Sequence, residues 1–229
     1  LLETARGGLM RRGLVQPNAD VALVTNISAD HLGQWGLTDV HALADAKLVV
    51  ARAVRSGGTI VLNRDCPILV SAYERLDASF KKERGILWFS TAANTTRDGL
   101  TGWLDGDDLV LKLEANHNFR IPVRSIPLTL GGAALHNIQN ALAAALVAHA
   151  LGFGGNDIRK GLESLLPNLE DSRGRSNLYE VDNKYLLLDF AHNPGGLKMM
   201  AELSRRWPKG ERYFLMGQAG DRNSDLVAE

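Results

Sequence analysis

A histidine and a lysine are the side chains of this sequence whose positions first suggest chemistry. His31 comes shortly after an apolar run, residues 21–27, which predicts a parallel strand covered on both faces. Ligands of such sheets gather beyond the carboxyl ends of the strands, so His31 would lie where ligands bind. Lys47 falls on the apolar face of the helix predicted next. This face consists of Val40, Leu43, Ala44, Val50, Ala51 and Val54. The pair indicates half of a magnesium nucleotide site.

An ammonium group on an apolar helix face needs an explanation. Burying it unpaired is costly, so Lys47 must reach water, pair with a carboxylate or lose its charge. Glu3, followed by Gly7 and Gly8, would supply the hard oxygen ligand that Mg²⁺ prefers. A lysine that snorkels to water and a glutamate that is only a solvated terminal charge are the alternatives, and the residues alone leave them open.

A polar cluster opens the long helix predicted at residues 135–151. His136, Asn137 and Asn140 directly follow two glycines at residues 131–132. Amide groups can hydrogen-bond the edge of a purine, and three polar side chains exceed what one helix cap needs. We interpret the cluster as a contact to adenine, with simple capping as the alternative.

A second polar cluster follows the apolar strand predicted at residues 185–190. Asp189 lies at the carboxyl end of that strand, and Pro194 lies near the start of the next helix, where a missing N–H is tolerated. Such clusters usually face a ligand, which makes Asp189, His192 and Asn193 candidates for binding. Helix capping by Asp189 and a plain loop role for His192 are the alternatives.

Two arginines lie in the stretch at residues 167–176, whose polar, charged and glycine residues predict a linker between domains. Charges in such a stretch are usually solvated. The alternative is that Arg173 and Arg175 neutralise the phosphates of a ligand held between two domains.

Composition limits what these residues can be part of. The sequence has 229 residues, 45% of them hydrophobic, with 26 basic and 26 acidic side chains, so it can bury a core in one large or two smaller domains. A zero balance gives no support for binding nucleic acid or an anionic membrane. One cysteine, Cys66, excludes an internal disulfide, and neither a long apolar run nor a leader is present. We therefore expect a cytoplasmic enzyme.

The elements that position these residues alternate in the first part of the chain, which predicts a parallel sheet. Residues 99–126 change to short runs typical of an antiparallel meander. A helix with Asp157 as its N-cap follows the long one. The last part predicts one βαβ unit. The expected strands are 21–27, 59–63, 86–89, 185–190 and 212–216, and the other expected helices are 40–54, 70–80 and 196–206.

Taken in order, these segments resemble the Mur ligase family of ATP-dependent amide-bond ligases. In detail they are most similar to the ligase part of the cyanophycin synthetases within it. The motifs that carry the resemblance are Leu2-Glu3-Thr4-Ala5-Arg6-Gly7-Gly8 with Arg11-Arg12-Gly13-Leu14, Thr25-Asn26-Ile27 leading to Asp30-His31-Leu32-Gly33, Lys47, Gly132 through His136-Asn137 to Asn140, Gly174-Arg175, and Leu188-Asp189-Phe190-Ala191-His192-Asn193-Pro194.

The resemblance implies an α/β fold. Residues 1–167 would be the central ATPase domain, with a parallel sheet and a small antiparallel sheet. Residues 168–176 would be a linker and 177–229 the start of a Rossmann-like C-terminal domain, so that the chain is incomplete at both ends.

The resemblance also implies roles for single residues. Lys47 would be carbamylated, an anion that binds a second Mg²⁺, and with His192 it would be catalytic. Glu3 and His31 would bind metal. The nucleotide base would contact His136, Asn137 and Asn140, and ATP would also contact Arg175 and Asp189. His192 and Asn193 would lie near the phosphates or the acyl substrate.

The implied reaction makes an acyl phosphate from ATP and a carboxylate, which an amine then attacks. The expected partners are ATP, Mg²⁺, an amino acid such as arginine and a carboxylate on a peptide or polymer. Nucleic acid and membranes are not expected as partners, and a homo-oligomer is left open. Another Mur-type ligase, for peptidoglycan precursors or polyglutamate, and a non-catalytic ligase-like binding module are the alternatives.

The sequence departs from the family pattern in two ways. It contains no glycine-rich phosphate loop ending in Gly-Lys-Ser or Gly-Lys-Thr, which the family carries upstream of the position of Glu3. We therefore expect this chain alone not to turn over ATP and to be a fragment of a longer protein. The turn at residues 63–67 is also less acidic than in the enzymes it resembles.

Overall fold

The computed structural model describes residues 1–28, 33, 36–114, 117–207 and 210–217. His31 lies outside these residues. The chain divides into two compact units. Unit 1 comprises Leu1–Ile121 and Gln139–Arg159, and unit 2 comprises Pro122–Ile138 and Lys160–Glu229.

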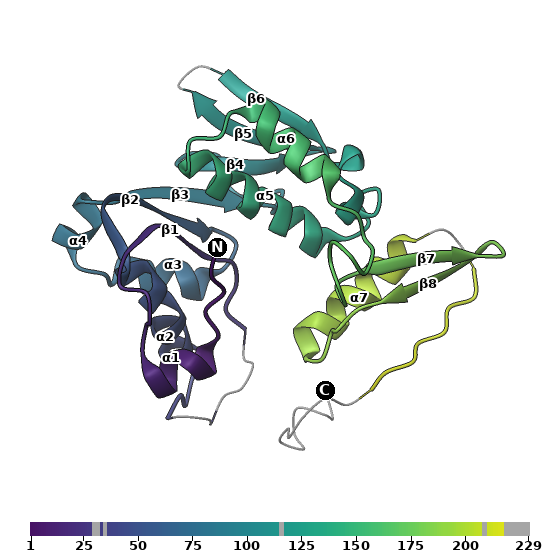
Figure 1. Cartoon of the computed structure of the whole chain (residues 1–229), viewed down its shortest axis with the longest axis horizontal. Helices are drawn as coiled ribbons and strands as arrows, with labels where there is room; N and C mark the ends of the chain where they lie inside the picture. The colour runs from purple at the N-terminus through teal and green to yellow at the C-terminus, as the bar shows by residue number, and fades with distance from the viewer. Residues whose placement is uncertain (29–32, 34–35, 115–116, 208–209, 218–229) are drawn as a thin grey trace. The chain divides into compact units, whose positions relative to one another are not determined.

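Unit 1 is built on one sheet of six strands among its described residues (Figure 1). The strands follow each other in chain order, and β1 to β4 pair in parallel, whereas β4 and β5 pair antiparallel. The predicted α/β fold is thus confirmed. The first strand of the predicted meander, β4, pairs in parallel with β3 and so continues the parallel sheet. The strands are β1 (Ala19–Val24), β2 (Val54–Asn63), β3 (Gly85–Ser90), β4 (Leu100–Asp105), β5 (Asp108–Glu114) and β6 (His117–Pro122).

Helices connect β1 to β2 and β2 to β3. After α1 (Arg6–Arg12), helix α2 (Val40–Arg52) begins at Asp39, whose carboxylate accepts hydrogen bonds from the N–H groups of His41 and Ala42. These hydrogen bonds lower the pKa of the Asp39 carboxyl. Four side chains of α2 are buried against the sheet, namely Leu43, Ala44, Leu48 and Ala51. Val54, predicted on this helix, instead begins β2 and pairs with Ala19 of β1.

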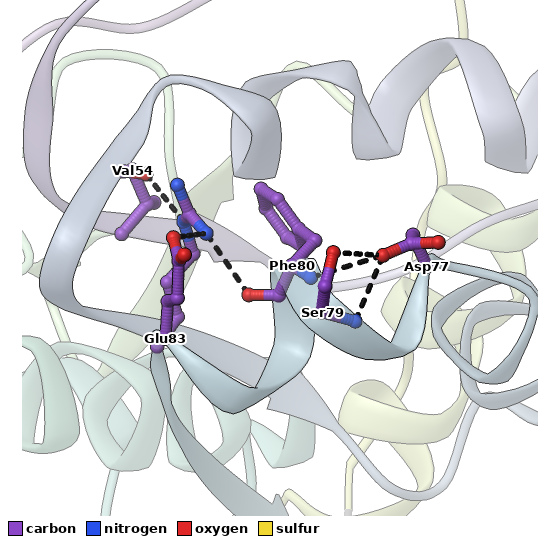
Figure 2. Close-up of polar contacts among 6 residues, drawn as sticks. Val54, Asp77, Ser79, Phe80 and Glu83 are labelled. Carbon is purple, nitrogen blue, oxygen red and sulfur yellow. Dashed lines mark hydrogen bonds and ion pairs between the residues drawn. The ribbon is translucent and has the colours of Figure 1, made fainter.

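The helix predicted at residues 70–80 is two helices, α3 (Pro67–Glu74) and α4 (Ala78–Lys82). The chain breaks between them because the Asp77 carboxylate starts a new helix, accepting hydrogen bonds from the N–H groups of Ser79 and Phe80 (Figure 2). Arg84 then fastens the end of α4 to the sheet. Its guanidinium donates to the carbonyls of Phe80, at 2.9 Å, and Val54, at 2.6 Å.

The link from β3 to β4, residues 91–99, is too short for the helical crossover that parallel strands usually need. The two strands are staggered, so that Trp88 pairs with Leu100 and Ser90 pairs with Trp103. The chain therefore has only a short distance to return, and no helix is required.

Parts of two further helices, α5 (Leu135–Ala150) and α6 (Gly155–Ser164), complete unit 1. Unit 1 includes Gln139–Ala150 of α5 and Gly155–Arg159 of α6. Helix α5 packs closely on β4 because Gly102 has no side chain. A Cβ there would lie only 3.0 Å from Leu142 Cδ1. The predicted N-cap of α6 is wrong, since Asp157 lies inside its first turn.

Unit 2 contains the hairpin of β7 (Asn177–Val181) and β8 (Lys184–Leu188), followed by α7 (Pro194–Arg206). Two short 3-10 turns, η1 (Val123–Ser125) and η2 (Pro127–Thr129), precede α5. The first strand and the helix of the predicted βαβ unit are confirmed as β8 and α7, but its second strand is wrong, because residues 212–216 form no strand. Asp182 and Asn183 adopt φ of 50° and 57°, the left-handed conformation that a tight hairpin turn needs.

None of the described helices has both the length and the apolar character that crossing a bilayer requires.

Candidate functional site

Amide side chains meet at the carboxyl ends of β1 and β2 in unit 1. Asn63, the last residue of β2, is fully buried, and its Nδ2 donates to Asn26 Oδ1 at 3.0 Å. Asn26 lies two residues beyond β1, and its Nδ2 donates to Gln139 Oε1 of α5 at 2.7 Å. This amide chain, Asn63–Asn26–Gln139, joins two strand ends to a helix at the edge where ligands of parallel sheets bind.

The carboxylate of Asp65 is saturated by hydrogen-bond donors. Ser90 Oγ donates at 2.5 Å, and the backbone N–H groups of Thr91 and Ala92 donate at 2.6 and 3.2 Å. The hydroxyls of Thr91 and Thr95 donate as well. Asp65 therefore anchors the short link from β3 to β4.

The three predicted metal ligands belong to three separate segments of the chain. Glu3 is exposed in the segment before α1, Lys47 is half-buried on α2, and His31 lies outside the described residues. Among the residues that the structure describes, no three His, Cys, Asp or Glu side chains gather into a metal-binding group. The magnesium site stays a prediction.

Another polar group, the unit 2 cluster, consists of His136, Ser176 and Asp189, which form a chain of contacts. His136 Nε2 lies 3.1 Å from Ser176 Oγ. Ser176 donates to Asp189 Oδ2 through its backbone N–H at 2.8 Å and its hydroxyl at 3.2 Å. Asp189 Oδ1 accepts from the N–H of Ala191. Two residues that the sequence singled out separately, His136 and Asp189, thus belong to one cluster.

Burial sets the charge of His136. Desolvation lowers the pKa of its imidazole, and the charge of Asp189 opposes this shift. Nδ1 is buried and has no hydrogen-bond partner among the described residues. The ring is therefore neutral near pH 7.

Arg175 and His192 both contact the ring of Phe190. The Arg175 guanidinium carbon lies 5.7 Å from the centroid of that ring, and the centroid of the His192 ring lies 4.8 Å from it. His192 Nδ1 lies 2.8 Å from the Phe190 carbonyl oxygen, which can only accept. Nδ1 therefore carries a proton, and Nε2 is the acceptor when the ring is neutral.

The other predicted contacts are used differently. Asn193 caps α7 by accepting a hydrogen bond from the N–H of Gly196 at 2.8 Å, so the cap of this helix is Asn193 and not Asp189. Asn137 Nδ2 donates to the Leu128 carbonyl at 2.8 Å, and Asn140 is exposed. The roles in ligand binding assigned to these residues stay predictions.

Unit 2 also contains a cavity of about 410 Å³ that is lined by none of the predicted site residues. It lies beside the turn before α5 and the end of α7. Its lining residues are Leu130, Gly131, Gly132, Ala133, Arg206 and Trp207.

Sequence reasoning missed four polar residues of the amide chain and of the unit 2 cluster as site residues, namely Asn26, Asn63, Gln139 and Ser176. Asn63 ends a buried strand beside β1, a signal that the strand-end rule could have used. Gln139 and Ser176 gave no such signal, because their roles depend on contacts between segments that are far apart in the sequence.

Comparison with known proteins places the chain in a wider context. Residues 1–148 match the family model of the Mur ligase middle domain. A cyanophycin synthetase of Crocosphaera subtropica is 34% identical over 236 residues, an alignment that covers 99% of this chain and 26% of that protein. The chain thus spans about a quarter of the length of the curated relatives it matches.

Solved structures share the fold. MurF from Acinetobacter baumannii superposes with a TM-score of 0.60 at 22% identity, covering 82% of this chain and 38% of that one. MurF ligase from Thermotoga maritima, in complex with ADP, gives a TM-score of 0.53 at 19% identity, covering 83% of this chain and 40% of that one.

Proposed function

The chain belongs to the Mur ligase family, and on that premise we propose that it is part of an ATP-dependent ligase that joins an amino acid to a carboxylate. The observation that carries the proposal is the 34% identity to a cyanophycin synthetase over 99% of the chain. This identity and coverage exceed those of UDP-N-acetylmuramoyl-tripeptide–D-alanyl-D-alanine ligase of Synechocystis, which is 29% identical over 84% of the chain. They therefore favour a cyanophycin-synthetase-like activity, with an amino acid such as arginine as the amine.

The proposed reaction needs a metal ion to balance the charge of the phosphates. ATP would transfer its γ-phosphoryl group to a carboxylate, and the amine would attack the acyl phosphate and release phosphate. Glu3, His31 and carbamylated Lys47 would hold Mg²⁺, whose charge would stabilise the transferring phosphoryl group.

The chain's own residues would bind and orient the nucleotide. His136, Asn137 and Asn140 would contact the base region, and Asp189 and Arg175 would contact ATP. Three donors already hold the Asp189 carboxylate in place, so it would meet a ligand hydroxyl in a fixed orientation. Arg175 is exposed and would offer its guanidinium to a phosphate. His192 and Asn193 would lie near the phosphates or the acyl substrate.

The test uses the whole protein that carries this chain. ATP consumption and amide formation are measured with candidate amino acids and carboxylates, for the wild type, His31→Ala and, as a matched control, the exposed His117→Ala. We expect amine-dependent turnover that His31→Ala abolishes and His117→Ala retains. A whole protein that neither binds nor consumes ATP would overturn the proposal and favour the binding module.

A further inference from the structure

Ser176 stands between two residues to which the proposed function gives nucleotide contacts. Its hydroxyl lies 3.1 Å from His136 Nε2 and 3.2 Å from Asp189 Oδ2. The side chain is fully buried, so water does not compete for these contacts. The backbone adopts a φ of 49°, a conformation that is unusual for a residue with a side chain. The fold thus holds this hydroxyl in place at some conformational expense.

The number of protons fixes the direction of both hydrogen bonds. The hydroxyl has one proton, and the ionised carboxylate of Asp189 can only accept. If Ser176 donates to Asp189, its oxygen remains to accept a proton from His136 Nε2. His136 then carries its proton on Nε2, and its buried Nδ1 is bare.

The reverse direction creates a conflict at Asp189. If Ser176 donated to His136, its oxygen lone pairs would face the Asp189 carboxylate at 3.2 Å, and the carboxylate would lose the donation of the hydroxyl. Nδ1 of His136 has no hydrogen-bond partner among the described residues in either case, so the carboxylate decides the direction.

We propose that Ser176 is a positioning residue that fixes His136 as the Nε2–H tautomer and holds the Asp189 carboxylate in the orientation that receives the nucleotide. This inference rests on the proposed function, since it presumes that His136 and Asp189 meet ATP. Ser176 itself does not touch the ligand in this scheme. It acts through its two neighbours and would therefore affect the affinity for ATP more than the chemical step.

Two substitutions remove the hydroxyl with different effects on the backbone. Ser176→Ala keeps a Cβ at a positive φ, whereas Ser176→Gly suits that φ and keeps the test valid if the alanine variant does not fold. Ser164→Ala, at an exposed serine in α6, is the matched control. In the whole protein we expect both Ser176 variants to raise the KM for ATP about tenfold, with kcat changed by less than about twofold.

A second readout does not depend on turnover. The ¹⁵N chemical shifts of the His136 imidazole, assigned by comparison with His136→Gln, distinguish a protonated ring nitrogen from a bare one. We expect a protonated Nε2 and a bare Nδ1 in the wild type, and a mixture of tautomers in both Ser176 variants.

The outcomes separate this inference from the proposed function. A wild type without ATP-dependent turnover overturns the proposed function, and the inference that rests on it falls as well. A wild type that turns over ATP, with an unchanged KM in both Ser176 variants or with a protonated Nδ1, overturns the inference alone. A lower melting temperature with an unchanged KM shows a merely structural serine and also overturns it.

Discussion

Two carboxylates of this chain differ in the capacity they retain for a ligand. A carboxylate has about four sites that accept hydrogen bonds. Asp65 receives five donors from the last residue of β3 and the link after it, whereas Asp189 receives three from Ser176 and Ala191. Asp65 is therefore committed to the fold, and Asp189 retains room for a ligand donor.

Replacement of Asp65 tests this commitment. Asp65→Asn keeps the shape but turns one oxygen into an NH₂ group that faces other donors. We expect the free energy of unfolding to fall by about 1–3 kcal/mol, as measured by urea denaturation. Asp107→Asn, at an exposed aspartate in the turn between β4 and β5, should leave it unchanged. Equal stability of both variants would contradict an anchoring role.

Lys47 provides a chemical test of the proposed carbamate. In the whole protein, Lys47→Ala should depress turnover by about tenfold or more, and a short carboxylic acid such as acetate should restore part of it by supplying the lost anion. Lys82→Ala, at an exposed lysine of α4, is the control. Full activity of Lys47→Ala without added acid would leave a lysine that only covers apolar surface.

Residue types and spacing predicted much of the unit 2 cluster. His136 and Asp189 were candidates because each follows a recognisable signal, a helix start and a strand end. Ser176 could not be found in this way, because its importance comes from burial, a positive φ and contacts with two distant segments. Metal binding by His31 is a main prediction from the sequence, and it stays a prediction.

The start of α7 shows how one side chain can serve both an element and a ligand. Asn193 caps this helix, and the proposed function also places it near the phosphates. Asn193→Ala removes the cap and should lower the free energy of unfolding by about 1 kcal/mol.

The charged variant separates the two roles. Asn193→Asp retains the cap, because aspartate caps helices as well as asparagine does, and it favours the positive end of the helix dipole. We expect near-normal stability in urea denaturation but a higher KM for ATP, because the new charge repels phosphates. An unchanged KM would place Asn193 away from the phosphates.

Local patterns predicted most elements of the chain and failed at one helix cap and at two strand pairings. The strands of the sheet, helix α5 and the start of α7 follow from periodicity and proline placement. The break before α4 depends on a cap at Asp77, and the end of α2 depends on the pairing of Val54 with Ala19. The parallel pairing of β3 with β4 depends on a stagger that the sequence of neither strand encodes.

The family and the α/β fold were predicted for the whole chain, and both are confirmed. The predicted domain limits at residues 167 and 176 follow chain order. The compact units instead group segments by contact, so that residues 122–138 join residues 160–229. His136 and Ser176 belong to one such unit although 40 positions separate them.

Acid stability is a property of the whole folded chain to which His136 contributes. Its pKa in the folded chain lies below the ordinary 6.5, so the unfolded chain takes up a proton that the folded chain does not. The contribution of His136 to stability is thus fully present above about pH 6.5 and is lost as the pH drops towards the lower pKa of the folded state. We expect urea denaturation to show a steeper loss between about pH 7 and pH 5 in the wild type than in His136→Gln.

Another histidine provides the control for this pH dependence. His117→Gln, at an exposed position in β6, should retain the slope of the wild type. Identical slopes for the wild type and His136→Gln would mean that the imidazole takes up its proton equally well in the folded and unfolded chains.

Cys66 makes the edge of the sheet at the carboxyl ends of β1 and β2 a source of kinetic information. This single cysteine of the sequence is only 7% exposed, and its thiol lies 3.9 Å from the Ile27 carbonyl oxygen, beside Asn26 of the amide chain. A thiol reagent can reach it only while the turn at residues 63–67 and the segment after β1 are apart. The rate at which the thiol is modified therefore measures how often this edge opens. A nucleotide that closed the edge would lower this rate.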